Sequence, residues 1–324
     1  MNNWEKSKLE DLGTLQRGRS RHRPRYAFHL YGGNFPFIQT GEIRASRKYV
    51  KEYQQTYSEA GLAQSKLWPA KTLCITIAAN IAELAILSFD ACFPDSVLGF
   101  IPNPQKADLD FIYYTLLHFQ KELKYIGEGS VQDNINLGTF QDISFPTPPL
   151  SDQVAIAAVL SSLDDKIDLL HRQNKTLEAM AEALFRQWFI EDPDKDWDTK
   201  PLSSIAVFLN GLACQKFPPT NDTDKLPVLK IKELSNGVSE STDWASNDVK
   251  SEYIVETGDV IFAWSASLMV KIWNGERCIL NQHLFKVTSK SYPKWFYLMW
   301  CKHHLAEFIA ISASHATTTT RSDQ

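Results

Sequence analysis

The sequence lacks the features that mark several common classes of protein. No apolar run in its 324 residues approaches the ~18 that a membrane-spanning helix needs, and the N-terminus has no apolar signal region. It contains no Walker A motif, so we do not expect ATP hydrolysis. The five cysteines are widely spaced without a Cys-x-x-Cys pair, and the eight histidines show no i, i+4 ligand spacing. These absences favour a cytoplasmic protein with reduced thiols and no bound metal or cofactor.

Positive charge is concentrated at one end of the chain. The net charge is −4, yet residues 1–51 hold eleven Lys and Arg side chains against four acidic ones. A basic region on an otherwise acidic protein is typical of a surface that binds a polyanion. With 44% apolar and 12% aromatic residues, the chain can also bury a core and is not expected to be disordered.

The chain carries the same pattern of residues twice, at an offset that falls from 193 to 184 residues. Small loop deletions explain this fall. The matched pairs are Trp4 and Trp197, Leu9 and Leu202, Leu12 and Ile205, Leu15 and Phe208, Gly18 and Gly211, Glu42 and Glu233, Ile75 and Ile261, Cys92 and Cys278, Leu98 and Leu284, Tyr113 and Tyr297, and Ser130 and Ser314. Two copies of a domain of ~150 residues are the natural interpretation.

A heptad pattern separates the two copies. Apolar residues and one asparagine are spaced alternately by four and three positions, at Ile156, Leu160, Leu163, Ile167, Leu170, Asn174, Leu177, Ala181, Leu184 and Trp188. This spacing predicts one coiled-coil helix over 151–190, ~60 Å long; the alternative is a core helix of a single globular domain. Ser151 is expected to cap its start, and Pro193 follows its end. We therefore expect a mixed α/β (α+β) fold, with domains at 1–147 and 193–324 and the helix at 148–192.

Three segments around this helix carry a resemblance to a known family. They are residues 129–135 (GSVQDNI), 143–153 (ISFPTPPLSDQ) and 160–167 (LSSLDDKI). The layout resembles the DNA specificity subunit of type I restriction–modification systems. The resemblance implies two target recognition domains that each read one half of a split double-stranded DNA target. It also implies two long antiparallel helices between them, whose length sets the spacing of the half-sites.

The resemblance implies a subunit that does no chemistry and on which methyltransferase subunits, and through them the restriction subunit, assemble. The sequence agrees: it has neither an Asn/Asp-Pro-Pro-Tyr/Phe motif nor a Gly-rich cofactor turn, so we do not expect the chain to methylate DNA itself. The sequence departs from the family in one respect: nothing in the second copy matches residues 141–190. The second recognition domain is therefore expected to be incomplete and the second long helix to be absent.

The first copy contains the clearest candidates for contacts to DNA. Arg17, Arg19, Arg21, Arg23 and Arg25 alternate with residues that include glycine and proline, which predicts a loop or edge segment able to meet phosphates or guanine. A solvated basic loop is the alternative. Two further polar groups follow in the same copy, namely Gln39, Thr40, Arg44, Arg47 and Lys48, and then Ser130, Gln132 and Asn134. For the last group, a polar turn is the alternative.

The second copy offers weaker DNA-binding candidates. They are Lys216, Lys230, Lys232, Ser265, Lys271, Gln282 and His283. The segment that corresponds to the arginines is far less basic, so two copies that both read DNA would read different sequences.

The heptad seam also predicts a partner, because a row of apolar side chains left in water would make a solitary helix unstable. The partner is either a second copy of the chain, lying antiparallel, or helices of a methyltransferase subunit. A different class of function also fits the repeats and the helix: a scaffold that binds no DNA and oligomerises through its coiled coil. Duplex binding discriminates between the two classes.

Overall fold

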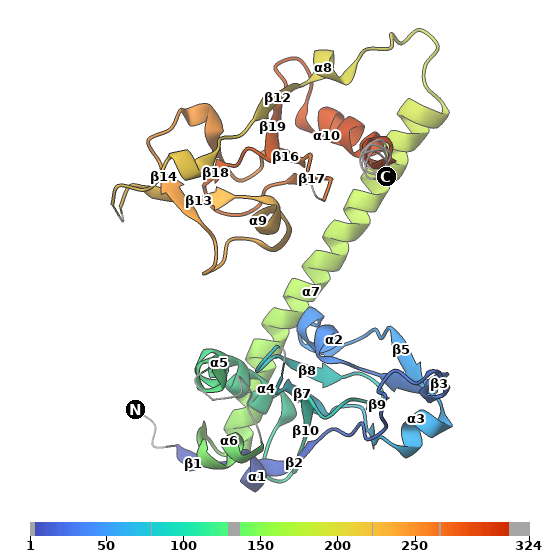
Figure 1. Ribbon diagram of the computed structural model, residues 1–324, viewed down its shortest axis with the longest axis vertical. Coiled ribbons are helices and arrows are strands. Elements are labelled where there is room, and N and C mark those ends of the chain that lie inside the picture. Colours follow the sequence, from blue (N-terminus) through green and yellow to red (C-terminus); the bar gives the residue numbers. More distant parts are fainter. Residues whose placement is uncertain (1–3, 79, 129–136, 222, 266, 311–324) are drawn as a thin grey trace, which may run out of the picture. The chain divides into compact units, whose positions relative to one another are not determined.

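The computed structural model describes residues 4–78, 80–128, 137–221, 223–265 and 267–310. The chain divides into two compact units, Met1–Gln173 and Asn174–Gln324, and one long helix, α7 (Leu150–Arg186), contributes residues to both (Figure 1). Each unit contains two main sheets with helices against them. The expectation of a mixed α/β fold with a long helix is confirmed. No helix among the described residues is long and apolar enough to cross a membrane.

The first unit is built on two main sheets. The larger has the strand order β2 (Gly13–Arg17), β10 (Val97–Pro102), β7 (Leu73–Thr76), β8 (Leu84–Leu87) and β4 (Tyr49–Val50). The smaller has the order β5 (Gln55–Tyr57), β3 (Tyr31–Phe37), β9 (Ala91–Cys92) and β6 (Leu67–Trp68). Pairing is antiparallel except between β4 and β8 and between β3 and β9.

Short helices and one small sheet complete this unit. The helices are α1 (Leu9–Leu12), the 3-10 turn η1 (Phe28–Leu30), α2 (Thr40–Ala45), α3 (Glu59–Ala63), α4 (Leu109–His118), α5 (Gln120–Glu128) and α6 (Leu137–Asp142). A two-stranded antiparallel sheet joins β1 (Glu5–Ser7) to β11 (Phe145–Thr147).

The main core of the unit lies between the larger sheet and α4. Asp108 caps α4 by accepting the Phe111 amide at 2.9 Å, which sets where the helix begins. Phe111 and Leu116 then face Ile75 across a continuous buried cluster. Burial of such side chains is worth about 1.5–3 kcal/mol each, so this contact fixes α4 on the sheet.

The second unit repeats this architecture. Its larger sheet has the order β12 (Val207–Asn210), β19 (Leu284–Thr288), β16 (Val260–Ala263) and β17 (Met269–Ile272). Its smaller sheet has the order β14 (Trp244–Ser246), β13 (Lys225–Leu229), β18 (Cys278–Leu280) and β15 (Ile254–Val255). Its helices are α8 (Leu202–Ile205), η3 (Cys214–Lys216), α9 (Ile231–Asn236), η4 (Ser251–Tyr253) and α10 (Lys294–His303).

The larger and the smaller sheet of the second unit match those of the first strand for strand, apart from β4 of the first unit. The duplication found in the sequence is therefore a structural repeat. Even the single parallel pair of the smaller sheet recurs, as β3 with β9 and as β13 with β18. Glu42 and Glu233 both close a capping box at the third residue of their helices, α2 and α9.

The structure corrects part of the expected pairing by one residue. Ile75 pairs with Leu98, and Phe262 pairs with Phe285, so the strand equivalence is 187 residues and not 186. Ile75 and Phe262 both face the helix-covered core, whereas Ile261 faces the opposite side of its sheet. Cys92 is shifted in the same way, because it pairs with Leu67 as Ile279 does with Ile254. A one-residue slip exchanges the two faces of a strand, and apolar residues occupy both faces here, so the sequence could not reveal the error.

The long helix α7 begins one residue earlier than expected. The amides of Asp152 and Gln153 donate to the Pro149 carbonyl at 2.9 and 3.0 Å, so Ser151 lies inside the first turn and is not the N-cap. Proline at the start of a helix costs nothing, since its missing N–H would have no helical partner. At its far end α7 continues as a π-helical turn, η2 (Gln187–Glu191), before Pro193.

Candidate nucleic-acid interface

A glycine anchors the basic segment of the first unit to the strand beside it. The Gly18 amide donates to the Val97 carbonyl at 2.8 Å, and a Cβ at Gly18 would lie 2.2 Å from the Pro94 carbonyl oxygen. The second unit repeats this approach: the Gly211 amide donates to the Leu284 carbonyl at 3.0 Å, and a Cβ there would lie 2.2 Å from the Asn281 carbonyl oxygen. The chain after each glycine therefore leaves its sheet at an equivalent place.

Four of the five arginines bind the protein itself. Arg17 and Arg19 donate to the carbonyls of Asp95 and Ser65, and the Nη2 atom of Arg25 donates to both oxygens of the Asp95 carboxylate at 2.9 and 3.1 Å. Arg23 donates to the Ser20 carbonyl at 2.8 Å. The predicted irregular segment is confirmed, but most of its guanidinium groups are held by the fold.

Arg21 is different from its neighbours. Its backbone amide donates to the Gln64 side chain at 2.6 Å, while its exposed guanidinium has no hydrogen bond or ion pair with any described residue. The side chains of Arg23 and Arg25 also keep 55% and 45% of their surface in solvent. This end of the segment therefore presents cationic groups on a fixed backbone.

The second predicted group lies on and after α2. Gln39 caps the helix, and its backbone amide donates to the Glu42 carboxylate at 3.1 Å. The exposed Arg44 donates to Asn80 at 3.0 Å. Thr40 is half-buried in the first turn, and Arg47 is exposed. These side chains, Lys48 excepted, remain candidates for DNA contacts.

The burial of Lys48 contradicts its prediction as a phosphate contact. Its Nζ atom lies 2.9 Å from Asp110 and donates to Tyr114 at 3.1 Å and to Ser161 at 2.8 Å. Burial by itself lowers the pKa of Lys48, but the bonds to Asp110 and Tyr114 outweigh it and raise that pKa above its ordinary value. Only 7% of this side chain is exposed, so Lys48 joins the segment after α2 to α4 and α7 and does not reach outward.

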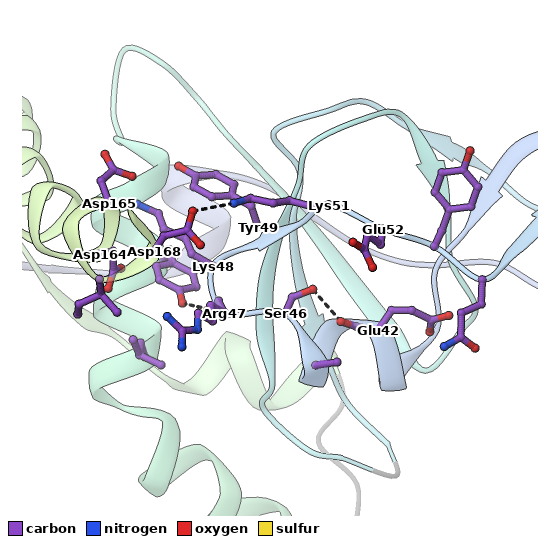
Figure 2. A pocket seen from close by; sticks show the side chains of 16 residues that line it. Glu42, Ser46, Arg47, Lys48, Tyr49, Lys51, Glu52, Asp164, Asp165 and Asp168 are labelled. Atoms are coloured by element: carbon purple, nitrogen blue, oxygen red, sulfur yellow. Dashed lines mark hydrogen bonds and ion pairs between the residues drawn. The ribbon is translucent and has the colours of Figure 1, made fainter. Parts of the chain in front are cut away.

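A cavity of about 570 Å³ adjoins Lys48 within the first unit. Its walls come from the segment after α2, from α4 and from α7, and Figure 2 shows Arg47, Lys48 and Lys51 facing Asp164, Asp165 and Asp168. Lys51 pairs with Asp168 at 3.1 Å, and its hydrogen bond lowers the pKa of that carboxyl. Because Lys51 and Asp168 join its two sides, we interpret the cavity as part of the attachment of α7 to the unit.

The predicted residues of the second unit are spread over separate elements. Lys230, at the start of α9, pairs with Asp243 and lowers the pKa of that carboxyl. Lys232 donates to Ser241 at 2.5 Å, and Lys271 is exposed on β17 and donates to a backbone carbonyl at 3.5 Å. All three lysines thus have partners in the fold.

The remaining predicted residues of this unit are Lys216, Ser265, Gln282 and His283. Lys216 is exposed in η3, Ser265 is half-buried between β16 and β17, and His283 is exposed beside Trp264. The Gln282 amide donates to the Leu212 carbonyl at 2.8 Å. The predicted Ser130, Gln132 and Asn134 of the first unit lie outside the described residues.

The heptad seam of α7 is covered only at its start. Ile156 packs against the main core of the first unit, and Leu160 is half-buried. Further along, Leu163 is 58% exposed and Leu177 is 62% exposed. The other exposed seam residues are Ile167, Leu170, Asn174, Ala181, Leu184 and Trp188. No described residue buries this part of the seam.

Sequence reasoning missed two aromatic residues that directly follow the basic segment, residues 17–25. Phe28 is 96% exposed and Tyr26 is 78% exposed. The available signal was their position three and one residues after Arg25, since aromatic side chains interleaved with cations are typical of nucleic-acid surfaces. It also missed Asp95, because nothing in the sequence links this acid to arginines 70 or more residues away.

All five cysteines are free and buried, and burial raises the pKa of the Cys278 and Cys301 thiols to about 12. No group of three His, Cys, Asp or Glu side chains gathers within the described ranges in a way that could hold a metal ion. What the arrangement offers is a basic, aromatic surface and an apolar helix face.

Comparison with known proteins identifies the family. The family model for the type I restriction modification DNA specificity domain matches residues 1–179 and again residues 194–323. The chain therefore belongs to this family, and each structural repeat carries one match.

Individual relatives agree. The chain is 25% identical over 274 residues to the type I restriction enzyme MjaIX specificity subunit of Methanocaldococcus jannaschii, covering 77% of this chain and 62% of that protein. It is 27% identical over 207 residues to the HindI specificity subunit of Haemophilus influenzae, covering 60% of this chain and 42% of that protein. The crystal structure of a type I restriction-modification S subunit from M. genitalium superposes with a TM-score of 0.54 at 14% identity, covering 97% and 81% of the two chains. This last likeness supports the fold.

Proposed function

We propose that this chain is a sequence-specific DNA-binding subunit of a type I restriction–modification complex, and that each unit reads one half of a bipartite target. The observation that carries the proposal is the double family match, which falls once on each copy of the repeated fold. The exposed cations of the basic segment, Arg21 above all, supply the contacts to phosphate in the first unit. In this proposal α7 sets the spacing of the two half-sites.

The chain itself acts without catalysis in this proposal. Methyltransferase subunits dock on it and methylate the DNA that it selects, and the restriction subunit joins through them. Relatives that are named specificity subunits support this role. The second candidate, a scaffold that binds no DNA, fits the repeats but leaves the basic segment without a purpose.

The proposal is tested by purifying the full chain with its methyltransferase and mapping the methylated sites on genomic DNA. A split recognition sequence is expected, and exchanging residues 1–147 for those of another family member should change one half of it only. The same chain alone should bind a 40-base-pair duplex with salt-dependent affinity. Absence of both duplex binding and sequence-selective methylation would favour the scaffold.

We further propose that a second copy of the chain, lying antiparallel, covers the exposed seam of α7. The seam is self-complementary, because Asn174 lies near the middle of the stripe from Ile156 to Trp188 and an antiparallel pair keeps apolar residues opposite one another. Each leucine of the seam that becomes fully buried would contribute about 1.5–3 kcal/mol. The amide of Asn174 then needs a partner across the interface.

The double variant Leu170→Asp with Leu177→Asp tests this pairing. Sedimentation should show a monomer in place of the dimer. The far-ultraviolet circular dichroism spectrum of the chain should stay that of the wild type, which would show that the units remain folded. Ala179→Asp, exposed on the same helix at the position opposite the seam, is the matched control and should leave the dimer intact. If the wild-type chain is monomeric and the double variant instead loses its methyltransferase, the seam is a methyltransferase site. If the wild-type chain is a monomer and the double variant still binds methyltransferase, neither a second copy nor methyltransferase covers the seam.

A further inference from the structure

Two of the three most exposed large aromatic side chains among the described residues lie two positions apart. Phe28 is 96% exposed and Tyr26 is 78% exposed; the third is Tyr125, at 79%, on α5. A phenylalanine side chain left almost wholly in water forgoes the benefit of burial. Its position at the end of the basic segment therefore calls for an explanation.

The backbone beneath these rings is tightly fixed. Phe28 opens η1, which ends at the buried Leu30, and the Leu30 carbonyl accepts the Ser58 amide at 2.9 Å. The Ser58 hydroxyl donates to the His29 carbonyl at 2.7 Å. Beneath η1, Leu30 and Tyr57 belong to one buried cluster. The ring of Phe28 is thus presented outward on a supported turn.

The same turn is tied to the arginines. The Tyr31 hydroxyl donates to the Arg25 carbonyl at 3.0 Å, and the rings of His22 and His29 meet edge to face at 5.0 Å. Arg25 is in turn held by Asp95. A polyanion bound by the exposed guanidinium groups would therefore lie against a surface that also carries Phe28 and Tyr26.

We infer that Phe28, supported by Tyr26, inserts between base pairs of duplex DNA and unstacks one step of the half-site read by the first unit. The inference rests on the proposed function and adds a deformation of the DNA to it. Duplex DNA fits this surface because it combines phosphates, which the arginines attract, with base faces, on which an aromatic ring stacks. Apolar wedges of this kind kink the duplex and favour steps that unstack easily.

Among the described residues of the second unit, the corresponding segment carries no such exposed ring. The segment from Gly211 to Asp224 corresponds to the basic segment, and its one aromatic residue, Phe217, is half-buried. Unstacking is therefore expected at one half-site only. This asymmetry gives the experiment an internal reference within the same DNA molecule.

The test uses the full chain and a pool of 40-base-pair duplexes with a random centre, enriched by repeated binding to the wild-type chain. Permanganate then reports unstacked thymines in the bound duplexes. Wild type should make thymines reactive in one half of the enriched sequence. Phe28→Ala should abolish this reactivity and weaken binding about tenfold, because one stacking contact is lost. Its salt dependence should not change, since no phosphate contact is removed.

Further variants separate stacking from other roles. Phe28→Trp should retain the reactivity, and Tyr26→Ala should weaken binding less than Phe28→Ala. Tyr125→Ala is the matched control, because Tyr125 is as exposed as Tyr26 but lies on α5, which is away from β3 in Figure 1. This variant should bind DNA as the wild type does. Equal melting temperatures of these variants would exclude a folding defect.

Three outcomes would overturn the inference. Unchanged affinity and thymine reactivity in Phe28→Ala would show that the ring does not enter the duplex. Loss of methyltransferase binding in Phe28→Ala with intact DNA binding would assign the ring to a protein contact. If the wild-type chain enriches no duplex at all, the proposed function itself fails, and the inference fails with it.

Discussion

The two units have the same sheet topology but contact α7 mainly through different kinds of side chain. Beyond the packing of Ile156, the first unit uses polar groups: Lys48 contacts Ser161, Lys51 pairs with Asp168, and Tyr114 donates to Asp164 at 2.6 Å. The second unit uses mainly aromatic rings, beside one ion pair from Lys302 to Glu182 at 2.7 Å. Phe185 and Phe189 stack 5.0 Å apart, and Phe185 lies edge to face with Trp300 at 5.1 Å. The repeated residues determine the sheets, whereas the two units contact different parts of α7 and therefore use different side chains to hold it.

The shared framework is tested by Gly18→Ala and Gly211→Ala. Each should cost about 3 kcal/mol of unfolding free energy, because the new Cβ would lie 2.2 Å from a backbone carbonyl that cannot easily move. Urea unfolding of the full chain measures this, followed by circular dichroism. Gly41→Ala, in α2 with open space around it, is the control and should be neutral or slightly stabilising. A large effect at only one of the two glycines would mean that the repeat does not extend to these turns.

The aromatic attachment in the second unit is tested by Phe185→Ala. Phe185 is 6% exposed, and removing such a ring costs about 3–5 kcal/mol. Seven of the nine tryptophans lie in residues 174–324, so tryptophan fluorescence during urea unfolding reports mainly on this unit. Met180→Ala, 55% exposed on the same helix, should change stability by less than about 0.5 kcal/mol. Similar effects of both variants would place Phe185 outside the packed contact.

The polar attachment in the first unit is tested by Lys48→Met. The change leaves Asp110 and Ser161 without their cation, which should cost about 2 kcal/mol, less than for a fully buried pair because Asp110 is one-third exposed. Lys51→Met removes an exposed pair and should cost less than about 1 kcal/mol. Hydrogen exchange of the α7 amides before residue 173 measures the loosening.

The pKa of Lys48 adds a check on this attachment. That pKa is raised on folding, so its contribution is complete below the ordinary value of 10.5 and is lost only as the pH rises through the higher folded value. The attachment should therefore be insensitive to pH between about 6 and 9. Marked loosening within that window would mean that another group governs it.

The contacts across long stretches of sequence are what the sequence could not predict. The repeat, the heptads and the mixed fold follow from periodicity, which is a local property of the chain. Lys48 looked like Arg47, its neighbour in a basic run, and only the fold brings Asp110 and Ser161 to it. In the same way, the exposed guanidinium of Arg21 is distinguished from that of Arg25 by Asp95, 70 residues further on. Pattern identifies the segment that carries a site, and tertiary contacts decide which side chains in it are available.

The basic segment of the first unit carries more positive charge than the corresponding segment of the second unit, and this difference gives the smallest expected effect, a change in the salt dependence of DNA binding. Arg21→Ala should lower the slope of log affinity against log salt by about 0.9 on a 40-base-pair duplex, because one phosphate contact is lost, and should leave the melting temperature unchanged. Arg19→Ala is the contrasting variant: its guanidinium holds the Ser65 carbonyl, so it should lower stability. Lys216→Ala probes the corresponding segment of the second unit. A slope change equal to that of Arg21→Ala would mean that both units hold phosphate there despite their unequal charge, whereas no change in Arg21→Ala would show that the basic segment does not touch the DNA backbone.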